Sequence, residues 1–105
     1  MKISSIWFML SLLVSLPLMA ESEMTTEHQQ YLLNFLKQDC GSCHGLTMRG
    51  GLGPALLPES LAGKSSDYIT ITILEGRPGT AMPPWKSVLS REDARWMAEN
   101  LLRGL

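Results

Sequence analysis

Two segments of the chain repeat apolar residues at intervals of three and four positions, one in the first half and one at the carboxyl end. The first segment has an apolar face made of four residues: Tyr31, Leu32, Phe35 and Leu36. The second has a face made of five: Ala94, Met97, Ala98, Leu101 and Leu102. This spacing predicts two amphipathic helices. Because each helix has a single apolar stripe, we expect the two to bury their stripes against each other.

Polar residues at the starts of these segments match helix-capping patterns. Thr26 is predicted to cap the first helix, with the side chain of Gln29 reaching back as in a capping box. Ser90 and Asp93 stand three positions apart before the second helix and resemble a capping box in which Asp replaces the usual Glu. Gly104 is the expected end of this helix.

Residues 65–76 are compatible with two secondary structures. Isoleucine alternates with threonine over residues 69–73, which is the period of a β-strand. No partner strand is visible after residue 20, and a lone strand leaves its backbone groups unpaired. Ser65 or Ser66 is a suitable N-cap and Gly76 a suitable stop, so the segment is predicted to be a helix. Its expected shared face consists of Tyr68, Ile69, Thr72 and Ile73.

The segment from residue 45 to residue 63 is rich in glycine, proline and leucine. Its glycines and prolines exclude a long regular element. Five leucines are distributed along it: Leu46, Leu52, Leu56, Leu57 and Leu61. A loop this apolar is expected to wrap over the face of a bound group. With three predicted helices and no strand pairs, the sequence predicts an all-α fold.

The first twenty residues have the pattern of a secretory signal peptide. Lys2 precedes an apolar run from Ile6 to Leu18, and the segment ends on a small residue, Ala20. The run is short for a transmembrane span, although an uncleaved amino-terminal anchor is the alternative. We therefore expect a signal peptide at residues 1–20 and one domain at residues 21–105, exported to the periplasm.

The charge of the chain argues against nucleic acid as a partner. The full sequence has 9 Lys and Arg against 10 Asp and Glu, a formal net charge of −1. Removal of residues 1–20 takes away Lys2 alone, which leaves a net charge near −2. The sequence has no basic stripe and no cluster of interleaved basic and aromatic residues, which is the footprint of nucleic-acid binding.

The sequence Cys40-Gly41-Ser42-Cys43-His44 carries the most specific chemical signal in the chain. Cys-x-x-Cys-His is the attachment motif of c-type haem, in which each thiol bonds a porphyrin vinyl group and the histidine reaches the iron. A thioredoxin-like site needs a βαβ scaffold, and a zinc site needs four ligands where the chain adds only His28. A disulfide would close too short a loop to stabilise much. We expect one covalent haem c.

A six-coordinate haem needs a second axial ligand, and methionine sulfur and histidine are the usual choices. Met82 is favoured because it lies in an irregular segment, residues 79–85, that is far from the motif and stiffened by two prolines. The other methionines after residue 20 are Met24, Met48 and Met97. Met24 precedes the first helix, Met48 follows the motif too closely, and Met97 lies within the last helix. His28 is the alternative ligand.

The second ring nitrogen of His44 also needs a partner. Metal-bound histidines usually donate this N–H to a carbonyl or carboxylate, which fixes the ring. Pro54, in the sequence Gly53-Pro54-Ala55-Leu56, is placed to offer its carbonyl. A simple turn proline is the alternative interpretation.

These motifs together resemble the class I c-type cytochromes. The resemblance rests on the haem-attachment motif, on Gly53-Pro54 and on Met82-Pro83, and it extends over residues 21–105. It implies a small all-α fold in which the terminal helices cross and a third helix runs from Asp67 to Glu75. It assigns roles to five residues: haem attachment to Cys40 and Cys43, iron ligation to His44 and Met82, and support of His44 to Pro54.

Three longer segments are similar to the cytochrome c-55x family, which is associated with the periplasmic cytochrome cd-type nitrite reductase of denitrifying bacteria. They are residues 38–47, 50–56 and 76–85. The resemblance implies a one-electron carrier, not an enzyme, that donates to this reductase. We expect a monomer, with a dimer formed by exchange of the terminal helices as the alternative. The alternatives are a redox role in maturation of the reductase's special haem, donation to another terminal reductase or oxidase, and gas sensing after dissociation of Met82. No stable membrane insertion is expected after signal cleavage.

Overall fold

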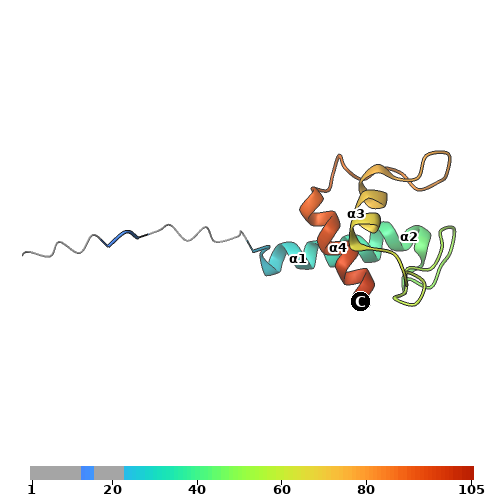
Figure 1. Ribbon diagram of the computed structural model, residues 1–105. Helices are drawn as coiled ribbons and strands as arrows, with labels where there is room; N and C mark the ends of the chain where they lie inside the picture. Colours follow the sequence, from blue (N-terminus) through green and yellow to red (C-terminus); the bar gives the residue numbers. More distant parts are fainter. Residues whose placement is uncertain (1–12, 16–22) are drawn as a thin grey trace, which may run out of the picture.

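The computed structural model describes residues 13–15 and 23–105 (Figure 1). Over these residues the secondary structure is entirely helical: α1 (Thr26–Phe35), the π-helical turn η1 (Leu36–Cys40), α2 (Gly41–His44), α3 (Ser66–Glu75) and α4 (Arg91–Arg103). The predicted all-α fold is therefore confirmed. The predicted signal peptide falls outside the described residues apart from residues 13–15, and it stays a prediction. Among the described helices, none is long and apolar enough to cross a membrane.

Helix α1 is capped one residue earlier than predicted. Thr25, not Thr26, has the extended backbone of an N-cap, and its hydroxyl accepts a hydrogen bond from the backbone N–H of His28 at 3.1 Å. Gln29 does not complete a capping box, because its side-chain amide donates to the carbonyl of Met24 at 3.3 Å. Two adjacent threonines are equivalent caps by residue type, so the sequence could not distinguish them.

A π-helical turn joins α1 to the cysteine motif. The N–H of Gly41 donates to the carbonyl of Leu36, five residues earlier, and this turn was not predicted. π-Helical turns occur mainly as single insertions within α-helices and are frequent at functional sites. The inserted residue rotates the next part of the chain about the helix axis. For this reason η1 sets the direction in which Cys40 and α2 face relative to α1.

Helix α3 confirms the predicted helix and its caps. The hydroxyl of Ser65 accepts from the N–H of Tyr68 at 3.1 Å, and Gly76 ends the helix with a positive φ of 66°. The predicted face was partly wrong, because Tyr68 is 47% exposed and the buried residues are Ile69, Thr70, Ile73 and Leu74. The hydroxyl of Thr70 donates to the carbonyl of Ser66 at 2.6 Å, which lets this polar residue lie in the core.

Helix α4 begins with the predicted capping box. Ser90 Oγ accepts from the N–H of Asp93 at 3.0 Å, while Asp93 Oδ2 accepts from the N–H of Ser90 at 3.1 Å. Gly104 ends the helix, as predicted. Four of the five residues predicted for the buried face, Ala94, Met97, Ala98 and Leu101, are inside the protein, and the fifth, Leu102, is half-buried against the core.

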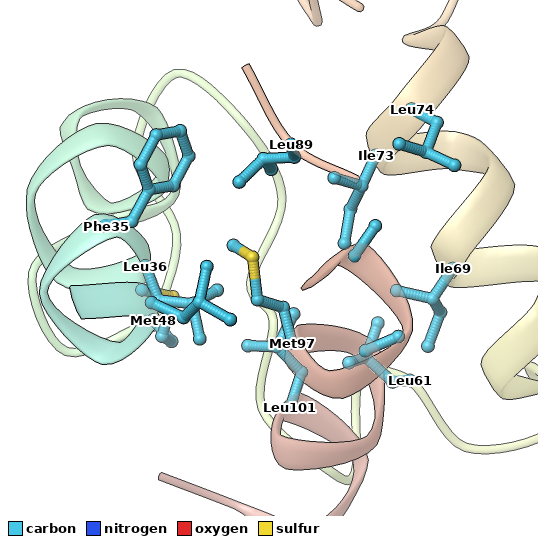
Figure 2. Close-up of a cluster of buried hydrophobic side chains, with 13 residues drawn as sticks. Phe35, Leu36, Met48, Leu61, Ile69, Ile73, Leu74, Leu89, Met97 and Leu101 are labelled. Carbon is cyan, nitrogen blue, oxygen red and sulfur yellow. The ribbon is translucent and has the colours of Figure 1, made fainter. Parts of the chain in front are cut away.

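The core lies where three helices meet. Helix α4 packs extensively along α3 and also contacts α1, so the expected contact of the terminal helices is present while much of the α4 stripe covers α3. Figure 2 shows side chains from α1 and η1, α3 and α4 converging, with Met97 among them. The residues joining this cluster from the loops include Met48, Leu61 and Leu89. The predicted face of α1 is buried except for Tyr31, which is 53% exposed.

A side-chain hydrogen bond ties the start of α1 to the start of α4. His28 Nε2 lies 2.7 Å from Asp93 Oδ1. Burial raises the pKa of Asp93, but the hydrogen bonds from His28 and Ser90 outweigh this effect and hold the pKa below its usual value. One carboxylate thus serves both the α4 cap and the contact between the terminal helices.

We expect the substitution His28→Ala to lower the free energy of unfolding by about 1 kcal/mol at neutral pH, the usual contribution of such a hydrogen bond. The pKa of Asp93 is lower in the folded than in the unfolded chain, so this contribution is present above about pH 4 and disappears as the pH falls through the folded value. The difference from the wild-type protein in urea unfolding should therefore shrink below about pH 4.

The matched control for this substitution is Gln30→Ala on the same helix, whose exposed side chain makes only a 3.5 Å contact to Asn34. The Gln30→Ala variant should unfold like the wild-type protein at every pH. A His28→Ala difference that did not change with pH would contradict the role assigned to Asp93.

Candidate haem site

The cysteine motif occupies the end of η1 and the single turn of α2. Cys40 is the last residue of η1, and Cys43 and His44 lie in α2. Both cysteines are half-buried free thiols, and His44 is 9% exposed. The helical turn therefore holds together the three residues that the sequence predicted for one site.

The ring of His44 is fixed by the carbonyl predicted for it. His44 Nδ1 lies 2.7 Å from the carbonyl oxygen of Pro54. With Nδ1 donating its proton to this oxygen, Nε2 is left as the nitrogen that can ligate iron. The loop that places Pro54 is itself tied to the motif, because Gly53 N–H donates to the carbonyl of Cys43 at 2.8 Å and Gly50 N–H to the carbonyl of His44 at 2.8 Å.

Gly53 packs directly against the imidazole ring of His44. A Cβ on Gly53 would be 2.7 Å from His44 Cε1 and 2.8 Å from Nδ1, closer than side-chain carbons approach other atoms. The absence of a side chain therefore allows the backbone to bring the Pro54 carbonyl to the ring. In the sequence, Gly53 is notable only as the neighbour of Pro54.

The substitution Gly53→Ala should lengthen the contact between His44 and Pro54. We expect a loss of roughly 1–3 kcal/mol in the free energy of unfolding, as for other overpacked sites. The reduction potential should rise, because a weaker hydrogen bond makes His44 a less basic ligand. Denaturant titration and redox titration measure the two effects.

The control for Gly53→Ala is Gly63→Ala. Gly63 has a positive φ of 83° and open space around it, so alanine there adds backbone strain without touching the site. It should reduce stability and leave the potential unchanged. If Gly53→Ala also left the potential unchanged, the proposed control of His44 through Pro54 would be wrong.

The thiol of Cys40 does not have the lowered pKa of a reactive cysteine. Burial, and then the charge of Asp39, raises the pKa of Cys40 to about 11. Catalytic and redox-active cysteines have a lowered pKa, because the thiolate is the reactive form. His28, the fourth residue needed for a zinc site, instead bonds Asp93 at the start of α4. These observations favour haem attachment over the thioredoxin-like and zinc interpretations.

The described residues contain four methionines, and only Met82 is outside the hydrophobic cluster. Met97 is fully buried and Met48 is 4% exposed, both within the core, while Met24 packs against it. Met82 is half-buried in the irregular loop between α3 and α4. Its sulfur is thus the one not committed to core packing.

The loop between α3 and α4 that carries Met82 (residues 76–90, the Met82 loop) is held in place by its own hydrogen bonds. Arg77 N–H donates to the carbonyl of Met82 at 3.1 Å. The hydroxyl of Thr80 donates to the carbonyl of Arg77 at 2.6 Å and accepts from the N–H of Met82 at 3.3 Å. In Figure 1 this loop and the loop that follows α2 both extend at the α2 end of the molecule.

The leucines of the loop after α2 divide into two groups. Leu61 is buried and Leu56 and Leu57 pack against the core, whereas Leu46 is 65% exposed and Leu52 is 81% exposed. The chain's own core thus uses three of the five leucines, and the expectation that this loop wraps over the face of a bound group stays a prediction. Leu46 and Leu52 remain as apolar surface beside the cysteine motif.

A haem-attachment motif on a helical turn, a histidine held by a proline carbonyl and an all-α fold define a c-type cytochrome. The family described as "Cytochrome C oxidase, cbb3-type, subunit III" matches residues 33–101, and the chain belongs to it. The chain is also 46% identical to cytochrome c55X of Pseudomonas aeruginosa, over 95% of this chain and 86% of that protein. Within the c-type cytochromes it is thus a member of the monohaem cytochrome c55X family.

Two solved structures show the same fold. The one described as "c-type cytochrome NirC" is 50% identical, with a TM-score of 0.74, and covers 76% of this chain and 94% of that chain. The other is described as "Dihydro-heme d1 dehydrogenase NirN in complex with DHE". It is 34% identical, with a TM-score of 0.65, over 70% of this chain but only 16% of that chain.

Membership in this family establishes the cofactor and the class of activity. The protein carries one haem c bound covalently through Cys40 and Cys43, and it is an electron carrier, not an enzyme. The residues present fit this group: two free thiols lie on adjoining turns, and Nδ1 of His44 is occupied so that Nε2 can face a metal.

Proposed function

We propose that this protein is a periplasmic one-electron carrier whose iron is ligated by His44 and Met82, and that it donates electrons to cytochrome cd-type nitrite reductase. The observation that carries the assignment of His44 is the 2.7 Å contact between its Nδ1 and the Pro54 carbonyl, which orients the ring as in a metal-bound histidine. Met82 is assigned because it is the described methionine that lies outside the hydrophobic cluster. The similarity to cytochrome c55X supports the nitrite reductase system.

The task of the polypeptide is to control the cofactor. Haem c supplies reversible uptake of a single electron. The chain holds His44 through Pro54 and offers the sulfur of Met82, and a methionine ligand raises the reduction potential above that of a bis-histidine haem. Ligands that do not change between the two oxidation states keep the structural rearrangement small, as an electron carrier requires.

The surface around the Met82 loop favours apolar docking. Ala81, Pro83 and Pro84 are exposed and uncharged. The nearby cation Lys86 is paired with Glu75 at 3.0 Å, so it adds little net charge, and Arg77 is the other exposed cation of this segment. Electron-transfer partners usually meet through small, weak interfaces. We therefore propose that the partner contacts this end of the molecule mainly through uncharged side chains.

A stopped-flow experiment tests the donor role and the docking mode together. The reduced holoprotein is mixed with oxidised, purified cytochrome cd-type nitrite reductase at increasing salt concentration. We expect rapid oxidation of the haem c with a rate that changes little with salt. A steep fall with salt would show electrostatic steering and contradict apolar docking. The absence of electron transfer would contradict the donor role.

A second candidate function is supported by one comparison. A domain of the same fold forms 16% of the solved dihydro-heme d1 dehydrogenase chain. The protein could thus exchange electrons with an enzyme that produces the special haem of the reductase. This maturation role uses the same site and the same one-electron chemistry but a different partner. The haem content of the reductase in a bacterial strain lacking this protein separates the two roles.

A further inference from the structure

Gly76 is the point at which α3 ends and the Met82 loop returns to the helix. It has a positive φ of 66°. A Cβ at this position would lie 2.6 Å from the carbonyl carbon of Pro83, 2.7 Å from the carbonyl oxygen of Met82 and 2.7 Å from the nitrogen of Pro84. All three neighbours are backbone atoms of the segment that carries the methionine.

Hydrogen bonds on both sides of this contact hold the returning segment against α3. Arg77 N–H, directly after Gly76, donates to the carbonyl of Met82 at 3.1 Å. Beyond the methionine, Trp85 N–H donates to the carbonyl of Ile73 at 3.1 Å, and Lys86 N–H donates to the carbonyl of Leu74 at 3.2 Å. The loop is therefore closed at its base by the last turn of the helix, with Gly76 at the centre.

Two properties of the position make glycine necessary. The backbone of Gly76, with φ 66° and ψ −165°, lies in a region that essentially only glycine adopts. In addition, the atoms that the Cβ would meet cannot turn aside as a flexible side chain could. Pro83 and Pro84 have fixed φ angles, which limits how this part of the backbone can yield. A side chain at residue 76 would thus push the segment that contains Met82 away from α3.

We propose that Gly76 is a positioning residue for Met82: its lack of a side chain lets the backbone of residues 82–84 seat on the end of α3 and thereby sets the location of the methionine sulfur. This inference rests on the proposed assignment of Met82 as the axial ligand. It gives the α3–loop junction a role in holding the reduction potential high, in addition to its role in ending the helix.

The chain provides two matched controls. Gly63 and Gly79 also have positive φ angles, 83° and 78°, but nothing lies within 4 Å of a Cβ built on either. Gly63 is remote in sequence from the Met82 loop, whereas Gly79 lies within it. Alanine at these two positions must also adopt a positive φ but meets no neighbouring atom, so the contact itself can be tested.

The experiment compares Gly76→Ala, Gly63→Ala, Gly79→Ala and Met82→Ala as purified holoproteins. Three properties are measured: the red absorption band that methionine sulfur gives with ferric iron, carbon monoxide binding to the reduced protein, and the reduction potential. We expect Gly76→Ala to lose most of the band, to bind carbon monoxide and to have a lowered potential. Gly63→Ala and Gly79→Ala should keep the wild-type band and potential.

Each result decides the inference. An intact band in Gly76→Ala would overturn it, because the contact at residue 76 would then not set the position of Met82. An equal loss of the band in Gly79→Ala would also overturn it, because a positive φ without the contact would then be enough to cause the loss. Failure of Gly76→Ala to accumulate holoprotein while the other variants accumulate would also overturn it, since the residue would then serve folding. Retention of the band in Met82→Ala would instead show that Met82 is not the ligand, and the failure would lie in the proposed function.

Discussion

A Cys40→Ala, Cys43→Ala double variant is expected to lose both the covalent haem and the cooperative thermal transition of the protein. The 85 residues after position 20 are expected to bury only about 60% of their unfolded surface, so the polypeptide alone is marginally stable. Apolar side chains such as Leu52, which is 81% exposed, find no cover in the core of the polypeptide itself. A large apolar cofactor beside the motif can provide this cover, so its loss should remove most of a total stability of about 5–15 kcal/mol.

Thermal unfolding followed by circular dichroism measures this effect, and Ser42→Ala is the matched control. Ser42 lies within the same motif, and its hydroxyl donates to the carbonyl of Asp39 at 2.7 Å at an exposed position. The Ser42→Ala variant keeps both thiols and should bind haem and unfold cooperatively. A sharp, cooperative transition in the double variant would show that the polypeptide folds without its cofactor and would contradict the expected dependence on haem.

The second large effect is expected for Met82→His. Replacing a methionine ligand by histidine lowers the reduction potential. Axial ligands set haem potentials over a range of about 0.8 V, so the fall should be a clearly measurable part of that range. The red absorption band of methionine-ligated ferric haem should also disappear. A redox titration of the purified holoprotein, followed by absorption spectroscopy, measures both the potential and the band.

Met97→Leu is the control for this substitution. Met97 is fully buried in the core, and a leucine of similar volume should cost less than about 1.5 kcal/mol. Its potential should equal that of the wild-type protein, because the core packing and not the ligation has changed. A Met82→His protein with an unchanged potential would mean that the second ligand is another residue.

The helices could be predicted because local signals and the wider fold agree. In α4, the capping box of Ser90, the apolar stripe and Gly104 all indicate the same boundaries. In α3, the alternation of isoleucine and threonine favoured a strand, but the caps at Ser65 and Gly76 and the lack of a partner strand favoured the helix that forms. Local propensity is overridden when no neighbouring strand can complete the hydrogen bonds.

Some features of the fold had no local signal. The residues of the π-helical turn, Leu36–Cys40, include no glycine or proline that would mark a departure from the α-helix. The buried face of α3 includes Thr70 and not Tyr68, because α4 and the loops determine which side of α3 is covered. Residues that lie on two candidate faces of a helix are assigned by the tertiary packing.

The haem site also combines residues that have a local sequence signal with residues whose role depends on tertiary packing. Cys40, Cys43 and His44 were evident because their chemistry depends on adjacent positions, and Pro54 is close enough in sequence to meet His44 through a short loop. Gly53 and Gly76 act by having no side chain where another backbone or ring approaches. Such contacts join segments that only the folded chain brings together, so the sequence indicated Gly53 only as part of the Gly53-Pro54 motif and Gly76 only as the end of a helix.

The measurement that tests the central claim most directly is made on a bacterial strain that lacks this protein. Its cytochrome cd-type nitrite reductase is purified, and the content of special haem and the activity with artificial electron donors are determined together with nitrite reduction by whole cells. The donor role predicts a fully loaded, active enzyme in cells that reduce nitrite slowly. A reductase without its special haem would contradict the donor role and establish maturation, and normal enzyme with normal cellular nitrite reduction would contradict both.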